Sequence, residues 1–178
     1  MRHRWLITAA IAVPLVPVAQ LAYAAEYVGV EAAQRAAFPD ATAFEPFVVS
    51  AEIKSEIARD AGRFVVSPQI WRVHANDRAL GWFIIDEVIG KTELITYGLA
   101  LDAKGAVKSI DVLAYRESHG DAIKLAAWRA QFAGKRASDP VKLDVDIRNI
   151  SGATLSCRHV AEGVHRLLQI YDKALARA

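Results

Sequence analysis

Four apolar segments between residues 70 and 115 decide the fold class. They span residues 70–74, 80–88, 94–101 and 107–115, and all are rich in β-branched and aromatic side chains. Turn-forming residues separate them, and Gly105 marks the clearest turn because glycine can adopt the positive φ that a hairpin bend requires. Short segments of this composition are typical of β-strands. We therefore predict an antiparallel β-meander.

One face of this predicted sheet must be covered. Along 94–101 the apolar side chains at alternate positions share a face, as the period of a strand requires. Two helices are available to cover it. In the first, Leu125, Trp128 and Phe132 lie on one stripe. In the second, apolar residues recur every three or four positions from 160 to 174, so we expect this helix to dock on the sheet.

The remaining segments are less regular. We predict a short helix over 30–38, a strand over 47–49, a short amphipathic helix over 53–58 and one more strand over 141–147. The sequence has no internal repeat, low-complexity tract or Ser/Gly-rich linker. The simplest architecture is therefore one α+β domain, in which an antiparallel β-meander is covered by two or three helices.

The first 24 residues have the three-part layout of a secretory signal peptide. Basic residues at 2–4 precede a mostly apolar run over 5–19, and small residues follow at positions 22 and 24. The run is shorter than the roughly 20 apolar residues of a membrane-spanning helix, and two prolines interrupt it. We therefore expect cleavage after Ala24 rather than a retained anchor, which leaves residues 25–178 as the mature domain, without a stable membrane anchor.

The residue content argues against a nucleic-acid partner, an internal disulfide and a metal site. The chain has 22 Lys and Arg against 20 Asp and Glu, and two of the cations, Arg2 and Arg4, lie in the predicted signal peptide. The mature domain is then neutral and has no basic stripe, so we predict no nucleic-acid partner. The lone Cys157 cannot form a disulfide within the chain. No set of His, Cys or carboxylate residues has the spacing of a metal site.

The segment that carries chemical information is 150–156, where an irregular stretch leads into the last helix. A helix start presents unpaired backbone N–H groups and a partial positive charge, which together can bind a phosphate. Gly152 would let the backbone approach such a group closely. Taken alone, Ser and Thr beside small residues before an amphipathic helix favour an ordinary helix cap over a phosphate site.

Its surroundings resemble a known family. The tetrapeptide Ser151-Gly152-Ala153-Thr154, followed by Ser156 and an amphipathic helix, resembles the flavinylation motif of the FMN-binding domain family. That family includes the periplasmic FMN-carrying subunits of sodium-pumping NADH:quinone oxidoreductase and of the RNF complex. Upstream segments at 81–84, 88–91, 115–120 and 128–135 occur in family order, and the resemblance covers roughly residues 80–168.

The resemblance implies a cofactor, a modification and a location. FMN would be esterified through its phosphate to Thr154 by a separate flavin transferase that uses FAD, at the start of the C-terminal helix. Ser151, Gly152, Ala153 and Ser156 are the motif neighbours of this acceptor. The protein would lie in the periplasm and exchange electrons with membrane or periplasmic redox proteins, as a carrier rather than as an enzyme with its own substrate.

Other residues are also candidates for the cofactor site. Arg158 lies four residues after Thr154 on the same helix face, either as a phosphate partner or as a solvated side chain. The resemblance places the turn 117–120 and the Gly134-Lys135 end of the first covering helix near the cofactor, and it implies roles for Glu117, His119 and Lys135. Four aromatic residues could supply an apolar floor for the flavin, although most are expected in the core: Trp82, Tyr97, Tyr115 and Trp128.

One position departs from the family pattern, and two other functions stay open. Many members have an Asp six residues before the acceptor, where this chain has Arg148, while Asp146 lies two residues earlier. Either Asp146 takes over the role of that acid, or modification is less favoured. The same site could instead bind FMN non-covalently, or the flavin could reduce a small exported substrate directly.

Overall fold

Five antiparallel strands form the sheet at the centre of the molecule, in the order β1-β2-β3-β4-β5. The computed structural model describes residues 29–178, and the predicted signal peptide over 1–24 lies outside the described residues. The strands are β1 (Ala43–Phe47), β2 (Gln69–Ala75), β3 (Arg78–Ile89), β4 (Leu94–Asp102) and β5 (Val107–Tyr115). Each strand pairs with the next one along the chain, which confirms the predicted meander.

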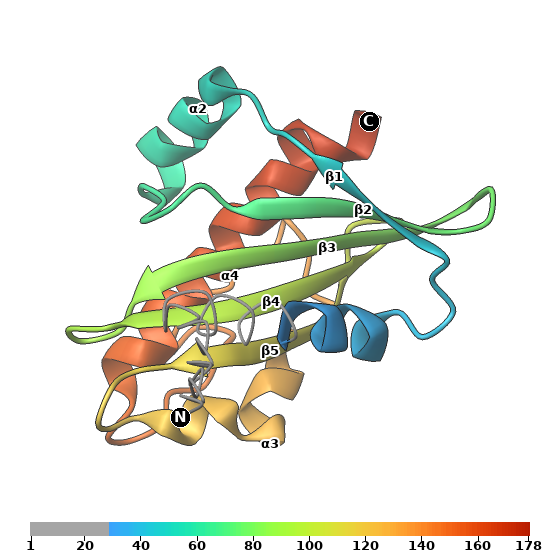
Figure 1. Cartoon of the computed structure of the whole chain (residues 1–178). Helices are drawn as coiled ribbons and strands as arrows, with labels where there is room; N and C mark the ends of the chain where they lie inside the picture. Colours follow the sequence, from blue (N-terminus) through green and yellow to red (C-terminus); the bar gives the residue numbers. More distant parts are fainter. Residues whose placement is uncertain (1–28) are drawn as a thin grey trace, which may run out of the picture.

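Helices lie on both faces of this sheet (Figure 1). A helix over 29–37 crosses one face, and α4 (Thr154–Lys173) runs along the other. The helix α2 (Ala51–Ala61) packs on α4, while α3 (Ala126–Arg129) lies beside β5 between two 3₁₀ turns. The 3₁₀ turns are η1 (Asp121–Lys124), η2 (Ala130–Phe132) and, after α4, η3 (Leu175–Arg177). The fold is therefore α+β, as the sequence predicts.

The main core lies between the sheet and α4. Alternate residues of β4 point to this side, and Ile95, Tyr97 and Leu99 are fully buried there. From α4, Val160 and Val164 pack into the same core, as the spacing of its apolar residues predicts. Burying each large apolar side chain contributes about 1.5–3 kcal/mol, so this row fixes α4 on the sheet along most of its length.

A glycine lets α4 approach the sheet closely. A Cβ atom added at Gly163 would lie 2.3 Å from the hydroxyl oxygen of Tyr97 and 3.0 Å from a methyl group of Val88. Real Cβ atoms do not approach other heavy atoms so closely. The buried Tyr97 side chain therefore occupies the space that a larger residue at position 163 would need.

The structure contradicts two of the predicted strands. The strand predicted over 47–49 ends at Phe47, because the last register pair with β2 is Phe47 with Ile70. Val48 is exposed, and Ser50 begins α2 by accepting a hydrogen bond from the N–H of Ile53 at 3.4 Å. The strand predicted over 141–147 does not form, and one isolated bridge is all that the segment contains.

The segment 141–147 folds into turns for a local reason. Val141 and Asp144 have positive φ values of 42° and 62°, which interrupt an extended chain. The carboxylate of Asp146 accepts hydrogen bonds from the N–H groups of Val141 at 3.2 Å and Lys142 at 2.8 Å. A side chain that captures backbone donors in this way competes with strand pairing.

The first predicted covering helix is shorter than its stripe suggests. Trp128 and Phe132 are buried, but Leu125 is 58% exposed. The chain changes between 3₁₀ and α geometry here, and Leu125 adopts an extended conformation at the junction between η1 and α3. That conformation turns its side chain away from the predicted stripe.

No helix within residues 29–178 is long and apolar enough to cross a membrane.

Candidate functional site

The start of α4 has donors without acceptors. The first helical hydrogen bond joins the N–H of Cys157 to the carbonyl oxygen of Ala153 at 2.9 Å. Within the described part of the chain, the N–H groups of Thr154, Leu155 and Ser156 have no hydrogen-bond partner, and no side chain caps the helix. The first turn also contains no acidic residue. This helix end therefore offers three donors and a partial positive charge to an anion.

Thr154, the predicted acceptor, is the first residue of α4. The residue is partly exposed, and the Nδ2 group of Asn149 donates a hydrogen bond to its Oγ1 atom at 3.1 Å. The preceding Gly152 has a φ of 83°, and no atom lies within 4 Å of the place where its Cβ would be. The backbone at Gly152 therefore has open space beside it, next to the partly exposed Thr154.

The loop after β5 packs directly against the motif. The hydroxyl of Tyr115 donates a hydrogen bond to the carbonyl oxygen of His119 and lies 3.1 Å from the Oγ atom of Ser156. Gly120 has a φ of 86°, and a Cβ atom there would lie 3.3 Å from both Ala153 and Ser156. Burial raises the pKa of the Tyr115 phenol, which therefore stays a hydrogen-bond donor at neutral pH. The structure thus brings this loop to the helix start.

Glu117 is directed into the turn between β3 and β4. Its carboxylate accepts hydrogen bonds from the N–H groups of Lys91, of Thr92 at 2.5 Å and of Glu93 at 2.8 Å. These backbone donors, Glu93 foremost, hold the pKa of Glu117 below its usual value. In the structure this side chain orders a turn next to the motif.

The same turn is joined to α4 by a histidine. The Nδ1 atom of His159 lies 2.6 Å from the carbonyl oxygen of Ile89 and 2.8 Å from that of Gly90. Since both partners are acceptors, Nδ1 must carry the hydrogen. Two exposed residues complete this region: His119, whose backbone carbonyl binds Tyr115, and Arg158, whose side chain makes no hydrogen bond or ion pair in the described chain.

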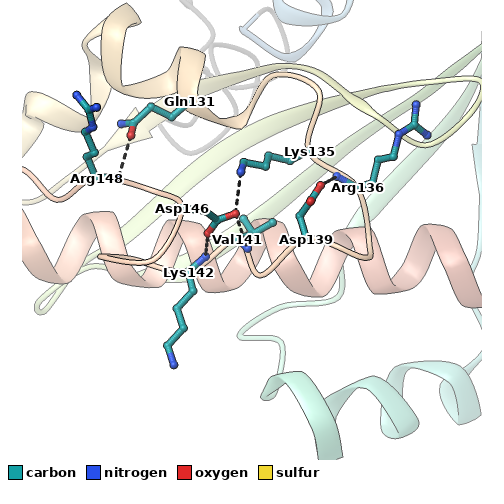
Figure 2. A network of polar contacts seen from close by, with 8 residues as sticks. All are labelled: Gln131, Lys135, Arg136, Asp139, Val141, Lys142, Asp146 and Arg148. Atoms are coloured by element: carbon teal, nitrogen blue, oxygen red, sulfur yellow. Dashed lines mark hydrogen bonds and ion pairs between the residues drawn. The ribbon is translucent and has the colours of Figure 1, made fainter.

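Lys135 orders the loop that precedes the motif (Figure 2). Its Nζ atom lies 2.8 Å from the Oδ2 atom of Asp146, whose carboxylate also binds the N–H groups of Val141 and Lys142. Burial opposes the ionisation of Asp146, but Lys135 and these donors outweigh it and lower the pKa of the carboxyl. Both Lys135 and Asp146 therefore hold the loop 141–147 in its conformation.

Arg148 is held by its backbone rather than by its side chain. Its N–H donates to the Oε1 atom of Gln131 at 2.8 Å, and its carbonyl accepts from the indole Nε1 of Trp128 at 2.9 Å. Figure 2 shows its guanidinium directed away from Asp146. The carboxylate of Asp146 and the side chain at position 148 therefore lie in different places.

Two surface hollows flank Arg148. One, of about 320 Å³, is lined mainly by apolar side chains, and the other, of about 420 Å³, by residues 144–149 and Gln131. The first is lined by Leu125, Ala127, Trp128, Gln131, Arg148 and Ile150. Its volume is within the range of small-molecule sites, and a flavin ring needs such an apolar floor. A further cavity of about 310 Å³, lined by Gln34, Trp71 and Ile85 among others, contains no residue of the motif.

The sequence comparisons assign this region. The model of the FMN-binding domain family matches residues 90–169. This part of the chain belongs to the FMN-binding domain family. The matched range contains the turn after β3, the loop after β5 and the start of α4, and the family indicates FMN as the cofactor and a flavin-binding electron-transfer module. A search of curated proteins finds no match to the chain.

The residues present fit an FMN group. The FMN-binding domain presents an uncapped helix end for a phosphate, and an apolar hollow for a ring is lined by Ile150 in the segment that leads into that helix. Sequence reasoning missed Asn149 and His159 as parts of this region. The contact of His159 joins residues that are 69 and 70 positions apart, and no local pattern reveals such a pairing.

Proposed function

We propose that this protein is an exported electron-transfer flavoprotein that carries FMN on Thr154 through a phosphoester. A flavin transferase would attach the group from FAD, and the protein would act in the periplasm. The observation that carries the proposal is a partly exposed threonine at an uncapped helix start within an FMN-binding domain. When bound, FMN supplies the electron-transfer chemistry.

Residues of this chain would hold the phosphate. A phosphodiester keeps one negative charge, which a helix start stabilises by about 0.3–1 kcal/mol. The free N–H groups of residues 154–156 supply donors, and the unpaired Arg158 supplies a cation one turn away. Ser151 and Gly152, which are both exposed, leave the approach to the hydroxyl open.

Other residues would hold the ring. The hollow beside Ile150 supplies apolar contacts from Leu125 and Trp128, and Arg148 places a cation at its rim. The side chain of His119 is exposed on the loop that packs against the motif. Glu117 and Lys135 would act indirectly, because their charged groups already order the turn after β3 and the loop before the motif.

A covalent bond suits a protein that works outside the cytoplasm. An FMN bound with a micromolar dissociation constant is held by about 8 kcal/mol, and it would be lost where free flavin is much scarcer than that. A phosphoester removes this equilibrium. The donor and acceptor of electrons would then be membrane or periplasmic redox proteins, and the carrier would turn over no small substrate of its own.

The test is intact-mass analysis of protein exported from a host that contains a flavin transferase. We expect one FMN on the wild type and none on Thr154→Val, which keeps the shape of the side chain but lacks the hydroxyl. An unmodified wild type beside an active transferase contradicts the proposal. Yellow colour released by acid precipitation indicates non-covalent binding, and turnover of a small substrate without a protein acceptor indicates a reductase.

A further inference from the structure

We propose that Asn149 is a positioning residue for the attachment of FMN, an inference that rests on the proposed function. Asn149 donates a side-chain hydrogen bond, of 3.1 Å from Nδ2, to the Oγ1 atom of Thr154. This is the hydrogen bond that the structure gives to the hydroxyl within the described chain. The side chain of Asn149 is exposed, so its contact is available at the surface where a transferase would act.

The direction of this hydrogen bond suits the reaction. During attachment the Oγ1 atom of Thr154 forms a bond to the phosphorus of the FMN half of FAD, and the bond from that phosphorus to the AMP phosphate breaks. AMP leaves, and the hydroxyl proton passes to a base of the transferase. Because Asn149 donates to a lone pair of Oγ1, it does not use the proton that must leave. The remaining lone pair and the O–H bond then point away from Asn149.

The backbone holds Asn149 in place on both sides. Before it, the N–H and carbonyl of Arg148 are bound by side chains of Gln131 and Trp128. After it, the N–H of Ala153 donates to the carbonyl of Ile150 at 3.0 Å and closes the turn that leads into α4. An amide held between two fixed points can orient a neighbouring hydroxyl, and orientation of a reacting group lowers the barrier to reaction.

The experiment measures the initial rate of flavinylation. The mature chain is purified from a host without transferase and mixed with purified flavin transferase and FAD, and the product is followed by flavin fluorescence and intact mass. Asn149→Ala should reduce the rate at saturating FAD by about 3- to 10-fold, the size expected for one lost hydrogen bond, with little change in KM for FAD. Asn149→Gln, which keeps the amide donor, should recover most of the rate.

Controls separate positioning from folding and from charge. Asn149→Asp exchanges the donor for an acceptor and should be slower than Asn149→Ala, whereas Asn76→Asp makes the same change in the exposed turn between β2 and β3 and should react like the wild type. The melting temperatures of the position-149 variants should match that of the wild type, because the side chain is exposed.

The outcomes distinguish the two proposals. A wild type that is modified as fast as Asn149→Ala overturns the role of Asn149 and leaves the proposed function standing. Equal losses in the Ala and Gln variants also overturn it, because the donor would then have no effect. A wild type that the transferase does not modify overturns both.

Discussion

Asp86 provides the sharpest prediction about stability. It lies on β3 beneath α4 and is only 2% exposed. Its Oδ2 atom accepts a hydrogen bond from the hydroxyl of Tyr97 at 2.8 Å, but Oδ1 has no hydrogen-bond partner within the described residues. Burial is the main cause that raises the pKa of Asp86 from 3.8 to about 6, while Tyr97 and the charge of Arg166 oppose this rise.

The sign of the effect follows from proton binding. Between pH 3.8 and about 6 the folded state holds a proton on Asp86 that the unfolded state has released, so stability falls as pH rises through this window. Above it, the ionised carboxylate lowers the free energy of unfolding by about 3 kcal/mol. Asp86→Asn resembles the protonated acid, so it should raise the free energy of unfolding by up to this amount at pH 7.5 and by almost nothing at pH 3.8.

Urea denaturation followed by tryptophan fluorescence at pH 7.5, 6 and 4 measures this difference. Asp77→Asn, in the exposed turn between β2 and β3, is the matched control and should change the free energy of unfolding little at any of these pH values. The reasoning is refuted if Asp86→Asn is less stable than the wild type at pH 7.5. Such a loss would mean that the attraction between Asp86 and Arg166 outweighs the desolvation of the carboxylate.

Two further predictions follow from the packing and the turn. Gly163→Ala should lower the free energy of unfolding by about 1–3 kcal/mol, because the new methyl group would clash with Tyr97 and this outweighs the better helix propensity of alanine. Urea denaturation measures the change, and an unchanged or higher free energy of unfolding would contradict the close packing. Glu117→Gln should speed hydrogen exchange at the backbone amides of Lys91, Thr92 and Glu93, because a neutral amide oxygen replaces the charged carboxylate oxygen that accepts from all three. Exchange rates equal to those of the wild type in NMR spectra would show that the carboxylate does not order the turn.

The sheet and the last helix could be predicted because their signals are local. Strand residues such as Ile95, Tyr97 and Leu99 alternate in the sequence as they alternate in space. The segment 141–147 alternates in the same way, yet Asp146 binds its backbone donors and Lys135 fixes the carboxylate. That competition depends on a lysine 11 residues away, which a pattern of alternation does not contain.

The candidate site shows the same division. The motif at 151–154 is continuous in the sequence, so its position at the start of α4 could be predicted. The contacts on either side of the motif come from three other segments: Tyr115 at the end of β5 contacts Ser156, Gly90 in the turn after β3 contacts His159, and Trp128 in α3 contacts Arg148. These contacts depend on how the chain closes in three dimensions, and the sequence alone does not display them.

The packing of α4 against the sheet limits how a bound flavin could move. The helix that begins at Thr154 is buried against the sheet by residues such as Val160 and Val164, and His159 fastens its second turn to the end of β3. On the proposed function, a flavin attached at Thr154 would therefore be bonded to a helix end whose position on the sheet is fixed, and only the side chain of Thr154 and the linker of the cofactor would contribute rotatable bonds. If FMN is attached at Thr154 as proposed, a redox partner would have to approach the end of the molecule where α4 begins.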